Sequence, residues 1–413
     1  MKKKTFRLAT LGCRTNQYET QAFRDQLLSL GYSEAAEGEG ADLCIVNTCT
    51  VTESADHSSR QQIRKLIRQN PEGQVVVTGC LAERRPDLIQ QIGGVTRVVP
   101  NAEKERLIAQ LFPEEDTPEF SIKRFEAHTR AFVKVQDGCN SFCTYCIIPY
   151  VRGRSRSRTI QEVVREVEHL VASGYQEVVI TGINVGDFED GDKGLADLVR
   201  AVDQVAGIKR VRISSIDPDE VDDDLMDAVI GGEHTCHSLH LVLQSGSNVI
   251  LKRMNRKYTR QVFLESVAKL KKASADFTFT TDVIVGFPGE TETDFQETLK
   301  VIEEVQFAKV HMFPYSNRER TRAALYPHQV IPEVMAERKN RILRLSEDVS
   351  YHLRNHYLGR TMEVLTESAE DTFIVGHTEN FLTVKLPREG LAPNQLVTAT
   401  LMHNTPDGLI CRI

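Results

Sequence analysis

Apolar and polar positions along the first 118 residues predict strands and helices in regular succession. Short apolar runs, such as 42–49 and 74–80, are separated by segments such as 18–30, in which apolar residues recur with helical spacing. Strand–helix alternation of this kind is typical of a parallel, doubly wound α/β sheet. The acidic, proline-containing stretch over 113–120 has no such pattern, and we expect it to be a linker.

The alternation resumes near residue 125 and changes character near the end of the chain. Six strand-like runs separated by helical stretches predict a partial (βα)6 barrel. The runs cover 131–135, 177–181, 210–215, 238–243, 277–285 and 308–313. After Gly359, five short strand-like runs with turn signals predict a small β-barrel. The expected domains are therefore 1–118, 125–355 and 356–413.

Composition is that of a globular protein, with 40% hydrophobic and 26% charged residues. No apolar run approaches the roughly 20 residues that cross a bilayer, and the basic start, Met1 to Lys4, precedes no apolar core of a secretion signal. We therefore expect a cytoplasmic monomer without membrane contact, whose nine cysteines stay reduced. Because the net charge is −7, any RNA contact must use local basic patches.

Three cysteines follow the first expected barrel strand, at the end of the barrel where such enzymes carry their active sites. Cys139, Cys143 and Cys146 have C-x3-C-x2-C spacing. One loop can thus ligate three irons of a [4Fe–4S] cluster and leave the fourth iron open. A structural zinc site is the alternative, but it needs four closed ligands, commonly from C-x2-C pairs. The spacing favours the open cluster.

A second set of cysteines is spread along the chain, because Cys13, Cys49 and Cys80 each end a predicted strand of the first sheet. Their separations of 36 and 31 residues each match about one strand–helix–strand repeat. Since the C-terminal ends of parallel strands share one crevice, we expect these thiols to converge, again with one position open. Three unrelated core cysteines are the alternative. The remaining cysteines are expected to be ordinary core residues: Cys44, Cys236 and Cys411.

A run of arginines follows the cysteine loop, with Arg152, Arg154, Arg156 and Arg158 alternating over seven residues. In an extended segment they would share one side. Because Arg binds phosphate oxygens well, we expect RNA or cofactor contact beside the cluster, with a solvated edge as the alternative. A second basic stretch over 252–260 fits a solvated helix face equally well.

The later barrel strands end in small or polar residues, at the end where a barrel binds its ligand. Each is weak evidence alone, but together they predict a polar slot for a cofactor. The candidates for cofactor contact are Gly182, Asn184, Ser214, Gln244 and Asp282.

Together these motifs resemble the methylthiotransferase family of radical S-adenosylmethionine (SAM) enzymes, along essentially the whole chain. The motifs that carry the resemblance are GCRTN (12–16), NTCT (47–50), TGC (78–80), QDGC onward (136–158), LQSGS (243–247) and the segment 281–290.

The resemblance implies an auxiliary [4Fe–4S] cluster on the first three cysteines, a radical-SAM cluster on the loop cysteines and an RNA-binding C-terminal TRAM domain. It implies that one SAM methylates sulfur at the auxiliary cluster. A second SAM yields a 5′-deoxyadenosyl radical, which removes hydrogen from C2 of a tRNA adenine before methylthio transfer. Tyr145 is expected near the SAM adenine, and Asn184, where many relatives have Glu, near the SAM amino group. An external electron donor and a sulfur source are also implied.

The segments 12–19 and 139–158 look most like the members that modify N6-threonylcarbamoyladenosine, 3′-adjacent to the anticodon. That substrate carries a carboxylate, which a basic pocket suits. The alternatives are N6-isopentenyladenosine in tRNA, an aspartate of a ribosomal protein and, more remotely, a non-enzymatic iron–sulfur RNA-binding or sensing protein. The expected TRAM region, 356–413, has four Lys/Arg and seven Asp/Glu, a formal −3 that suits phosphate poorly.

Overall fold

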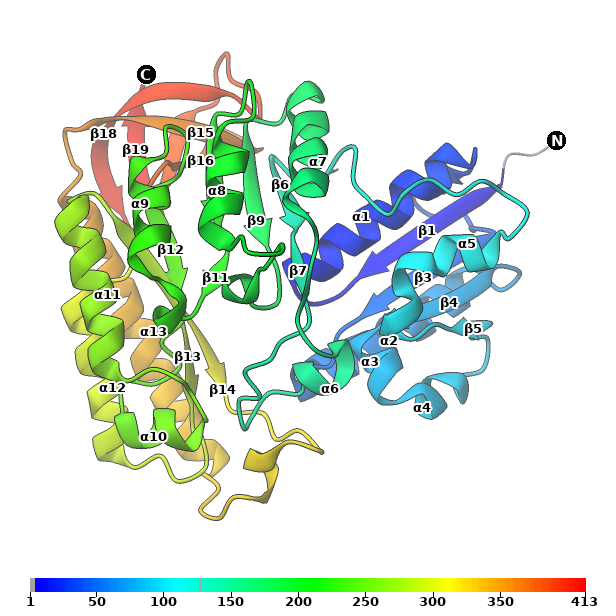
Figure 1. The fold of residues 1–413 in the computed structure, drawn as a ribbon, viewed down its shortest axis with the longest axis horizontal. Coiled ribbons are helices and arrows are strands. Elements are labelled where there is room, and N and C mark those ends of the chain that lie inside the picture. Colours follow the sequence, from blue (N-terminus) through cyan, green and yellow to red (C-terminus); the bar gives the residue numbers. More distant parts are fainter. Residues whose placement is uncertain (1–3, 126–127) are drawn as a thin grey trace.

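The structure, a computed structural model, describes residues 4–125 and 128–413. Residues 1–3 of the basic start and residues 126–127 of the expected barrel domain lie outside the described residues. Figure 1 shows a parallel sheet with its helices beside a larger, curved sheet, and a small β-barrel above one end of that curved sheet.

The N-terminal sheet is parallel, with strand order β2-β1-β3-β4-β5. In its central strand, Cys44 and Val46 pack into one apolar cluster while Leu43 and Ile45 pack into another. Both faces of the sheet are therefore covered, as a doubly wound fold requires. The strands are β1 (Thr5–Thr10), β2 (Ser33–Glu34), β3 (Leu43–Thr48), β4 (Gln74–Gly79) and β5 (Arg97–Val98). The helices are α1 (Arg14–Ser29), α2 (Glu53–Gln69), α3 (Cys80–Arg84), α4 (Pro86–Gln90), the 3-10 helix η1 (Asn101–Arg106) and α5 (Leu107–Leu111).

The sequence pattern predicts one helix over 85–92, but the structure has two short helices there. Helix α3 begins at Cys80 itself and ends at Arg84, and α4 begins at Pro86. Proline disfavours a helical conformation in the preceding residue, and Arg85 accordingly has φ −137°. The early start of α3 places Cys80 at the N-terminus of a helix.

The larger part is a partial barrel of parallel strands in two hydrogen-bonded groups, β10-β9-β6 and β11-β12-β13-β14. The single strand expected over 210–215 is interrupted at Ser214, where the chain changes pairing from β9 to β12. The strands are β6 (Arg130–Lys134), β9 (Glu177–Thr181), β10 (Arg210–Ile213), β11 (Ser215–Ile216), β12 (Ser238–Leu241), β13 (Thr278–Val285) and β14 (Lys309–Pro314), with a short pair β7 (Gln136–Asp137) and β8 (Arg156–Ser157).

Helices separate these strands, as the apolar periodicity predicts. Helix α7 begins after Thr159, whose hydroxyl accepts the Glu162 N–H while the Glu162 carboxylate accepts the Thr159 N–H. The helices are α6 (Ile148–Arg152), α7 (Ile160–Ala172), α8 (Leu195–Asp203), α9 (Asp223–Gly231), α10 (Asn248–Arg253), α11 (Arg260–Ala273), α12 (Glu292–Val305) and α13 (Pro332–Asn355), with the 3-10 turns η2 (Val185–Asp187), η3 (Pro218–Glu220) and η4 (Arg322–Leu325).

The C-terminal part is a closed barrel with strand order β15-β16-β17-β19-β18. It covers the end of the partial barrel where the strands begin. Arg210, at the start of β10, donates to the carbonyls of Glu363 and His377, and Arg212 donates to the carbonyl of Glu379. The strands are β15 (Thr361–Ala369), β16 (Phe373–Thr378), β17 (Thr383–Pro387), β18 (Leu396–Thr405) and β19 (Gly408–Arg412).

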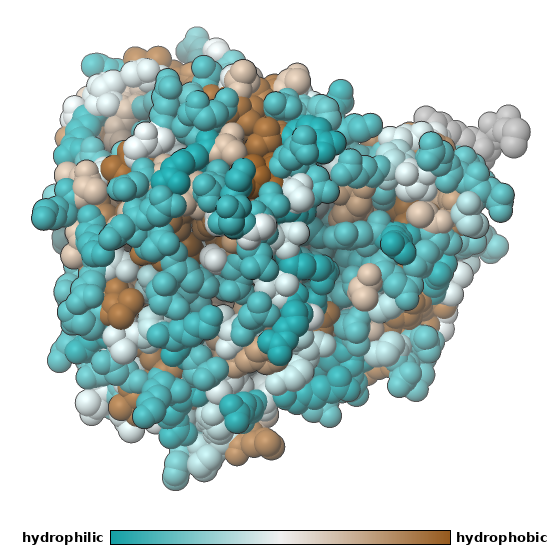
Figure 2. Space-filling model, in the orientation of Figure 1, coloured by the Kyte–Doolittle hydropathy of each residue, from teal (hydrophilic) through white to brown (hydrophobic). Residues whose placement is uncertain are grey.

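The surface in Figure 2 is mostly hydrophilic, with apolar residues in scattered patches. In the part of the chain that the structure describes, the helices are too short or too polar to cross a membrane.

Candidate active site

A cleft of about 460 Å³ lies between the N-terminal sheet and the partial barrel. One wall is the start of α1, where Cys13 and Arg14 follow β1. The other wall is formed by Thr181, Ser214 and Asp282 at the inner side of the barrel strands. The sequence-predicted residues Cys13, Gly182, Ser214 and Asp282 therefore share one cavity.

Cys13, Cys49 and Cys80 come together at three neighbouring strand ends. Gly12 has φ +95°, and a Cβ there would lie 2.8 Å from the Cys49 sulfur, so only glycine lets Cys49 pack against the chain beside Cys13. Gly79 has φ +97°, and a Cβ there would lie 2.4 Å from the backbone of Thr48. The glycines before Cys13 and Cys80 thus permit close backbone approach, as the sequence predicts.

Cys139, Cys143 and Cys146 lie on the loop between β7 and α6. The Ser141 N–H donates to the Cys139 sulfur at 3.4 Å, and the Cys146 N–H donates to the Cys143 carbonyl at 3.0 Å. Arg256 Nη1 donates to the Cys143 sulfur at 3.1 Å. The loop therefore turns back on itself, and a guanidinium from outside the loop reaches one of its sulfurs.

The charge of these thiols indicates what the two sets can hold. Burial, with the neighbouring Cys80 adding to the effect, raises the pKa of Cys49 to about 12. Burial likewise raises the pKa of Cys146 to about 12, with Cys143 adding to the effect. Thiolates can persist together here only with a cationic group such as a metal cluster. Within the described residues, no three His, Cys, Asp or Glu side chains converge on a single ion.

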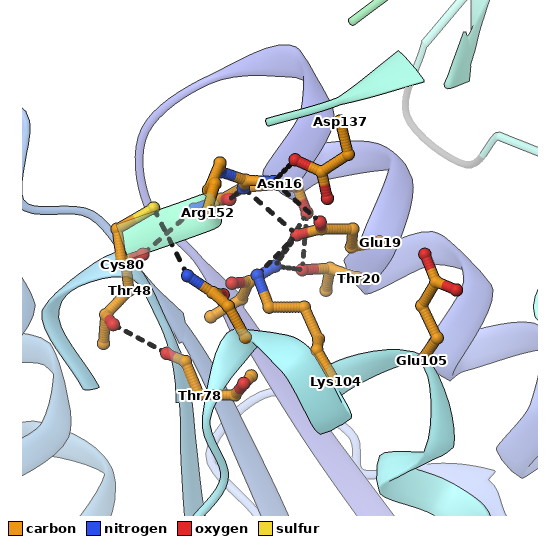
Figure 3. A network of polar contacts seen from close by, with 12 residues as sticks. Asn16, Glu19, Thr20, Thr48, Thr78, Cys80, Lys104, Glu105, Asp137 and Arg152 are labelled. Carbon is orange, nitrogen blue, oxygen red and sulfur yellow. Dashed lines mark hydrogen bonds and ion pairs between the residues drawn. The ribbon is translucent and has the colours of Figure 1, made fainter. Parts of the chain in front are cut away.

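A buried charge cluster of Glu19, Lys104, Lys134, Asp137 and Arg152 connects the N-terminal part to the segments on either side of the cysteine loop. Figure 3 shows Glu19, Lys104, Asp137 and Arg152 of this cluster together with Cys80. Arg152 Nη1 lies 3.1 Å from Glu19 Oε1 and 2.8 Å from Asp137 Oδ1. Lys104 Nζ lies 2.8 Å from Glu19 Oε2. Burial raises the pKa of Glu19, but Arg152 and Lys104 outweigh burial and hold the pKa well below its usual range. The N-terminal sheet is thereby fixed to the segment that carries the loop cysteines.

Apolar packing reinforces this junction between the two cysteine sets. Cys80 packs with Ile147 and Val151, on either side of the start of α6. Asn101 donates to the Val151 carbonyl at 2.5 Å and lies 4.0 Å from the Cys80 sulfur. Relative motion of the two cysteine sets would break these contacts.

The predicted cofactor slot contains buried polar atoms that lack a partner. Ser214 Oγ and Gln244 Oε1 have no hydrogen-bond partner among the described residues. Buried oxygens of this kind usually face a ligand, since leaving them unpaired is costly. Tyr145 packs edge-on against Phe287, with ring centroids 6.4 Å apart. The residues therefore fit a polar cofactor with an aromatic neighbour.

Asn184 is buried at the same end of the barrel, where it contacts a carboxylate. Its Nδ2 donates to Glu220 Oε1 at 2.7 Å. Burial raises the pKa of Glu220 to about 7, and the nearby Asp217 adds to the rise. Among the described residues, no cation pairs with this carboxylate to keep it ionised.

Comparisons with known proteins agree with this geometry. A model of the Radical SAM superfamily matches residues 133–302, and a model of the uncharacterized protein family UPF0004 matches residues 5–100. The chain is 51% identical to the threonylcarbamoyladenosine tRNA methylthiotransferase MtaB of Chlamydia pneumoniae, over 100% of this chain and 98% of that one. The chain belongs to the methylthiotransferase family of radical-SAM enzymes.

Two other matches have lower sequence identity. This methylthiotransferase is 33% identical to the tRNA-2-methylthio-N(6)-dimethylallyladenosine synthase of Clostridium perfringens, over 100% of this chain and 98% of that one. The radical S-adenosylmethionine methyltransferase TsrM of Kitasatospora setae has a TM-score of 0.57 at 14% identity and covers 75% of this chain and 72% of its own. The latter likeness supports the fold. Family membership, the α/β fold with its partial and closed barrels, and the use of SAM and two [4Fe–4S] clusters are thus confirmed.

The arginine run of this methylthiotransferase differs from our expectation. Arg152 ends helix α6 and is buried in the charge cluster, so the four residues do not form one extended face. Arg158 is held by Glu166 and by Tyr18 Oη, at 3.1 Å from the latter. The prediction of phosphate contact is therefore wrong for Arg152, whose buried guanidinium is occupied by Glu19 and Asp137. It stays a prediction for Arg158, which pairs with Glu166 but is partly exposed.

The other two arginines of the run stay at the surface. Arg156 is about half exposed, although it lies 3.1 Å from Asp137. Arg154 is exposed and lies over the ring of Phe142 at 4.4 Å. Phosphate contact stays a prediction for Arg154 and Arg156.

Two residues of this methylthiotransferase were missed by sequence reasoning. Arg256 belongs to the stretch that we judged equally compatible with a solvated helix face, but its side chain is buried between Cys143 and Asp217. Glu220 follows β11 in a segment with three other acidic residues, so nothing in the sequence singles it out. The one signal for Arg256 in the sequence was the aromatic residue Tyr258, close to it within a charged stretch. In the structure the Arg256 guanidinium lies over the Tyr258 ring, 4.7 Å from its centre.

Proposed function

We propose that this protein adds a methylthio group to C2 of N6-threonylcarbamoyladenosine, the tRNA nucleoside on the 3′ side of the anticodon. The observation that carries the proposal is the cleft in which Cys13, from the strand-end cysteine set, faces the polar barrel residues Ser214 and Asp282. A flipped-out base can enter such a cleft and meet both reactive centres. The identity to a relative that is named for this reaction supports the choice of nucleoside.

The proposal assigns the auxiliary cluster to the three strand-end cysteines and the radical-SAM cluster to the three loop cysteines. When bound, these groups and SAM supply an electron, a hydrogen-abstracting radical and methylated sulfur, so that the C2–H bond is replaced by C2–S. The chain contributes position, because effective concentration and orientation account for much of enzymatic rate enhancement. The buried charge cluster holds both cysteine sets at one fixed separation.

Within the barrel, the chain binds and orients SAM. We assign the unpaired oxygens of Ser214 and Gln244 to polar groups of SAM, and the ring of Tyr145 to its adenine. Glu220, rather than Asn184 alone, supplies negative charge for the SAM amino group, and Asn184 orients that carboxylate through its 2.7 Å hydrogen bond. Gly182 and Asp282 complete the wall of the cleft. Arg256 donates to the Cys143 sulfur and orients that ligand.

The remaining expectations belong to the same proposal. The segments 1–118, 125–355 and 356–413 act as the auxiliary-cluster, radical-SAM and TRAM units of a cytoplasmic monomer, which needs an external electron donor and a sulfur source. The TRAM unit carries few cations, and Arg210 and Arg212 use its carbonyls to dock it on the barrel. We therefore propose that tRNA affinity comes mainly from the catalytic part.

Mass spectrometry of tRNA nucleosides, from cells with and without this gene, tests the proposal. We expect 2-methylthio-N6-threonylcarbamoyladenosine to disappear with the gene and to return with the wild-type copy, while the unmethylthiolated nucleoside accumulates. Loss of the isopentenyl analogue instead would favour the second nucleoside substrate. Unchanged tRNA with a lost modification on a ribosomal protein would refute tRNA as the substrate.

A further inference from the structure

Arg14 lies in the cleft without a direct ion-pair partner among the described residues, and the carboxylates of Asp282 and Glu177 act on it only at longer range. It is the first residue of α1, directly after Cys13, and its side chain lines the cleft together with Thr181, Ser214 and Asp282. Its guanidinium lies 5.4 Å from the centre of the Phe132 ring. Among the residues that the structure describes, it forms no ion pair or hydrogen bond. A ring face orients a guanidinium but leaves its in-plane donors free.

The other charged groups around the cleft have partners. Arg130 lies 3.2 Å from Glu367, and Arg212 lies 2.8 Å from Glu177. The one carboxylate that lines the cleft, Asp282, lies 3.2 Å from His240 Nε2. Arg14 is therefore the cation of the cleft that is available to an anion brought by a ligand.

The proposed substrate brings such an anion on the edge of adenine that reacts. C2 and the N6 substituent lie on the same edge of the ring, on either side of N1, so a base with C2 presented to the Cys13 side also presents its N6 substituent there. In the threonylcarbamoyl group this substituent ends in a carboxylate, whereas an isopentenyl group is uncharged. Bidentate hydrogen bonding to a carboxylate is the interaction for which a guanidinium is best suited.

We propose that Arg14 binds the carboxylate of the threonylcarbamoyl group and thereby selects this nucleoside over uncharged N6 derivatives. The proposal rests on the proposed function and adds a residue that determines its specificity. Selection has two sides, because an uncharged substituent would also desolvate Arg14 without giving it a partner. A backbone phosphate offers similar anionic oxygens, and the experiment separates the two sources.

The test measures binding to the full-length, anaerobically reconstituted enzyme. The probes are anticodon stem-loop RNAs that differ at one nucleoside: threonylcarbamoyladenosine, its carboxyl methyl ester, isopentenyladenosine and adenosine. We expect the wild type to bind the acid about 10- to 100-fold more tightly than the ester, which is the range for a hydrogen-bonded charge pair. Arg14→Gln should abolish this preference and leave the affinity for adenosine RNA unchanged. Arg14→Lys should restore part of it.

Arg165→Gln is the matched control, because Arg165 is exposed on helix α7 and its replacement changes net charge equally. It should keep the full preference for the acid. Iron content and the near-ultraviolet and visible spectrum of each variant show whether the change beside Cys13 has disturbed the cluster. If Arg14→Gln loses iron, Arg14→Met, which is similar in length and uncharged, takes its place. A wild type that binds acid and ester equally would overturn the proposal without any variant.

The remaining outcomes separate this proposal from the proposed function. An equal loss with all four RNAs on replacing Arg14 would assign it to the RNA backbone and overturn the proposal. Conversion of the acid RNA to its methylthio product, together with an undiminished acid preference in Arg14→Gln, would overturn the role of Arg14 and leave the function standing. Conversion of isopentenyl RNA alone by the wild type would instead refute the proposed substrate.

Discussion

The loop cysteines, Cys139 to Cys146, lie within eight residues, whereas Cys13, Cys49 and Cys80 come from strand ends 36 and 31 residues apart. The loop set is arranged by local backbone turns and by contacts with the segment that follows α10, where Met254, Asn255 and Arg256 hydrogen-bond to it. The strand-end set exists only when β1, β3 and β4 have paired and when Gly12 and Gly79 allow their close approach. One centre thus depends on a short loop and the other on a whole sheet, which predicts different responses to mutation.

We expect the largest difference between the two cysteine sets when the ligands of one cluster are removed and those of the other are kept. Replacing Cys139, Cys143 and Cys146 by Ala should lower iron from about eight to about four per chain, since each cluster holds four. Formation of 5′-deoxyadenosine should cease, because the ligands of the SAM-binding cluster are gone. Iron assay and chromatography of the SAM products measure both. Continued formation of 5′-deoxyadenosine would contradict our assignment of the loop.

The reciprocal change should separate SAM cleavage from methylthio transfer. Replacing Cys13, Cys49 and Cys80 by Ala should also leave about four irons per chain. SAM cleavage should persist while the methylthio product disappears, because the loop set is locally arranged and survives. The same two assays, with nucleoside mass spectrometry, follow the result. Iron content equal to wild type would support three ordinary core cysteines instead.

The next effect tests the junction between the two sets. Glu19→Gln should destabilise the protein by about 3–5 kcal/mol, because Arg152 and Lys104 would stay buried with one anion fewer. Since the pKa of Glu19 is lowered on folding, its contribution is present above the ordinary Glu pKa of about 4.3 and is lost as pH falls below it. Urea denaturation at pH 7 measures the change. Asp224→Asn, at an exposed ion pair with Arg200, is the control and should change little.

A smaller effect concerns the SAM slot beside the loop set. Folding raises the pKa of Glu220 from 4.5 to about 7, so ionising it costs the cofactor-free protein stability as pH rises through that window. Glu220→Gln should therefore stabilise the cofactor-free chain by up to about 3 kcal/mol at pH 8 and by little near pH 4.5. The same variant should bind SAM more weakly. Denaturation at both pH values and equilibrium dialysis measure these changes, and a stability gain that does not vary with pH would refute the role of Glu220.

The smallest effect concerns RNA contact next to the loop set. Replacing Arg154 and Arg156 by Gln should reduce the log–log salt dependence of tRNA affinity by roughly 1.5–2 if both contact phosphate, at the usual slope of about 0.9 per contact. Iron content should not change, because no cysteine is touched. Titrations of tRNA between low and moderate salt measure the slope. An unaltered slope, with weaker SAM binding, would assign these residues to the barrel instead.

The strand-end set also shows what a sequence can reveal. Parallel strands with continuous apolar runs, such as 43–48, are predicted closely, and so is the convergence of three cysteines that follow such strands. The strand expected over 177–181 matches β9 at both ends. These features depend on residues that are near one another along the chain, or on the strand–helix–strand unit that repeats in a parallel sheet.

The parts that were not predicted depend on distant partners. Arg152 is close in sequence to Arg154 and indistinguishable from it, and contacts with Asp137 and with Glu19, 133 residues away, bury one and not the other. Arg256 reaches Cys143 across 113 residues. Pro86, by contrast, was a local signal for the break between α3 and α4 that the helical periodicity obscured.

The buried charge cluster also limits where this chain can recombine with the chain of a relative. Its anion Glu19 lies in the N-terminal third, and Arg152, which needs that anion, lies in the barrel. A recombinant that takes its first hundred residues from a relative without an anion at position 19 would therefore leave Arg152 and Lys104 buried with one anion fewer. We expect residues 19 and 152 to be exchanged together in working hybrids, so this pair is the place to design a crossover.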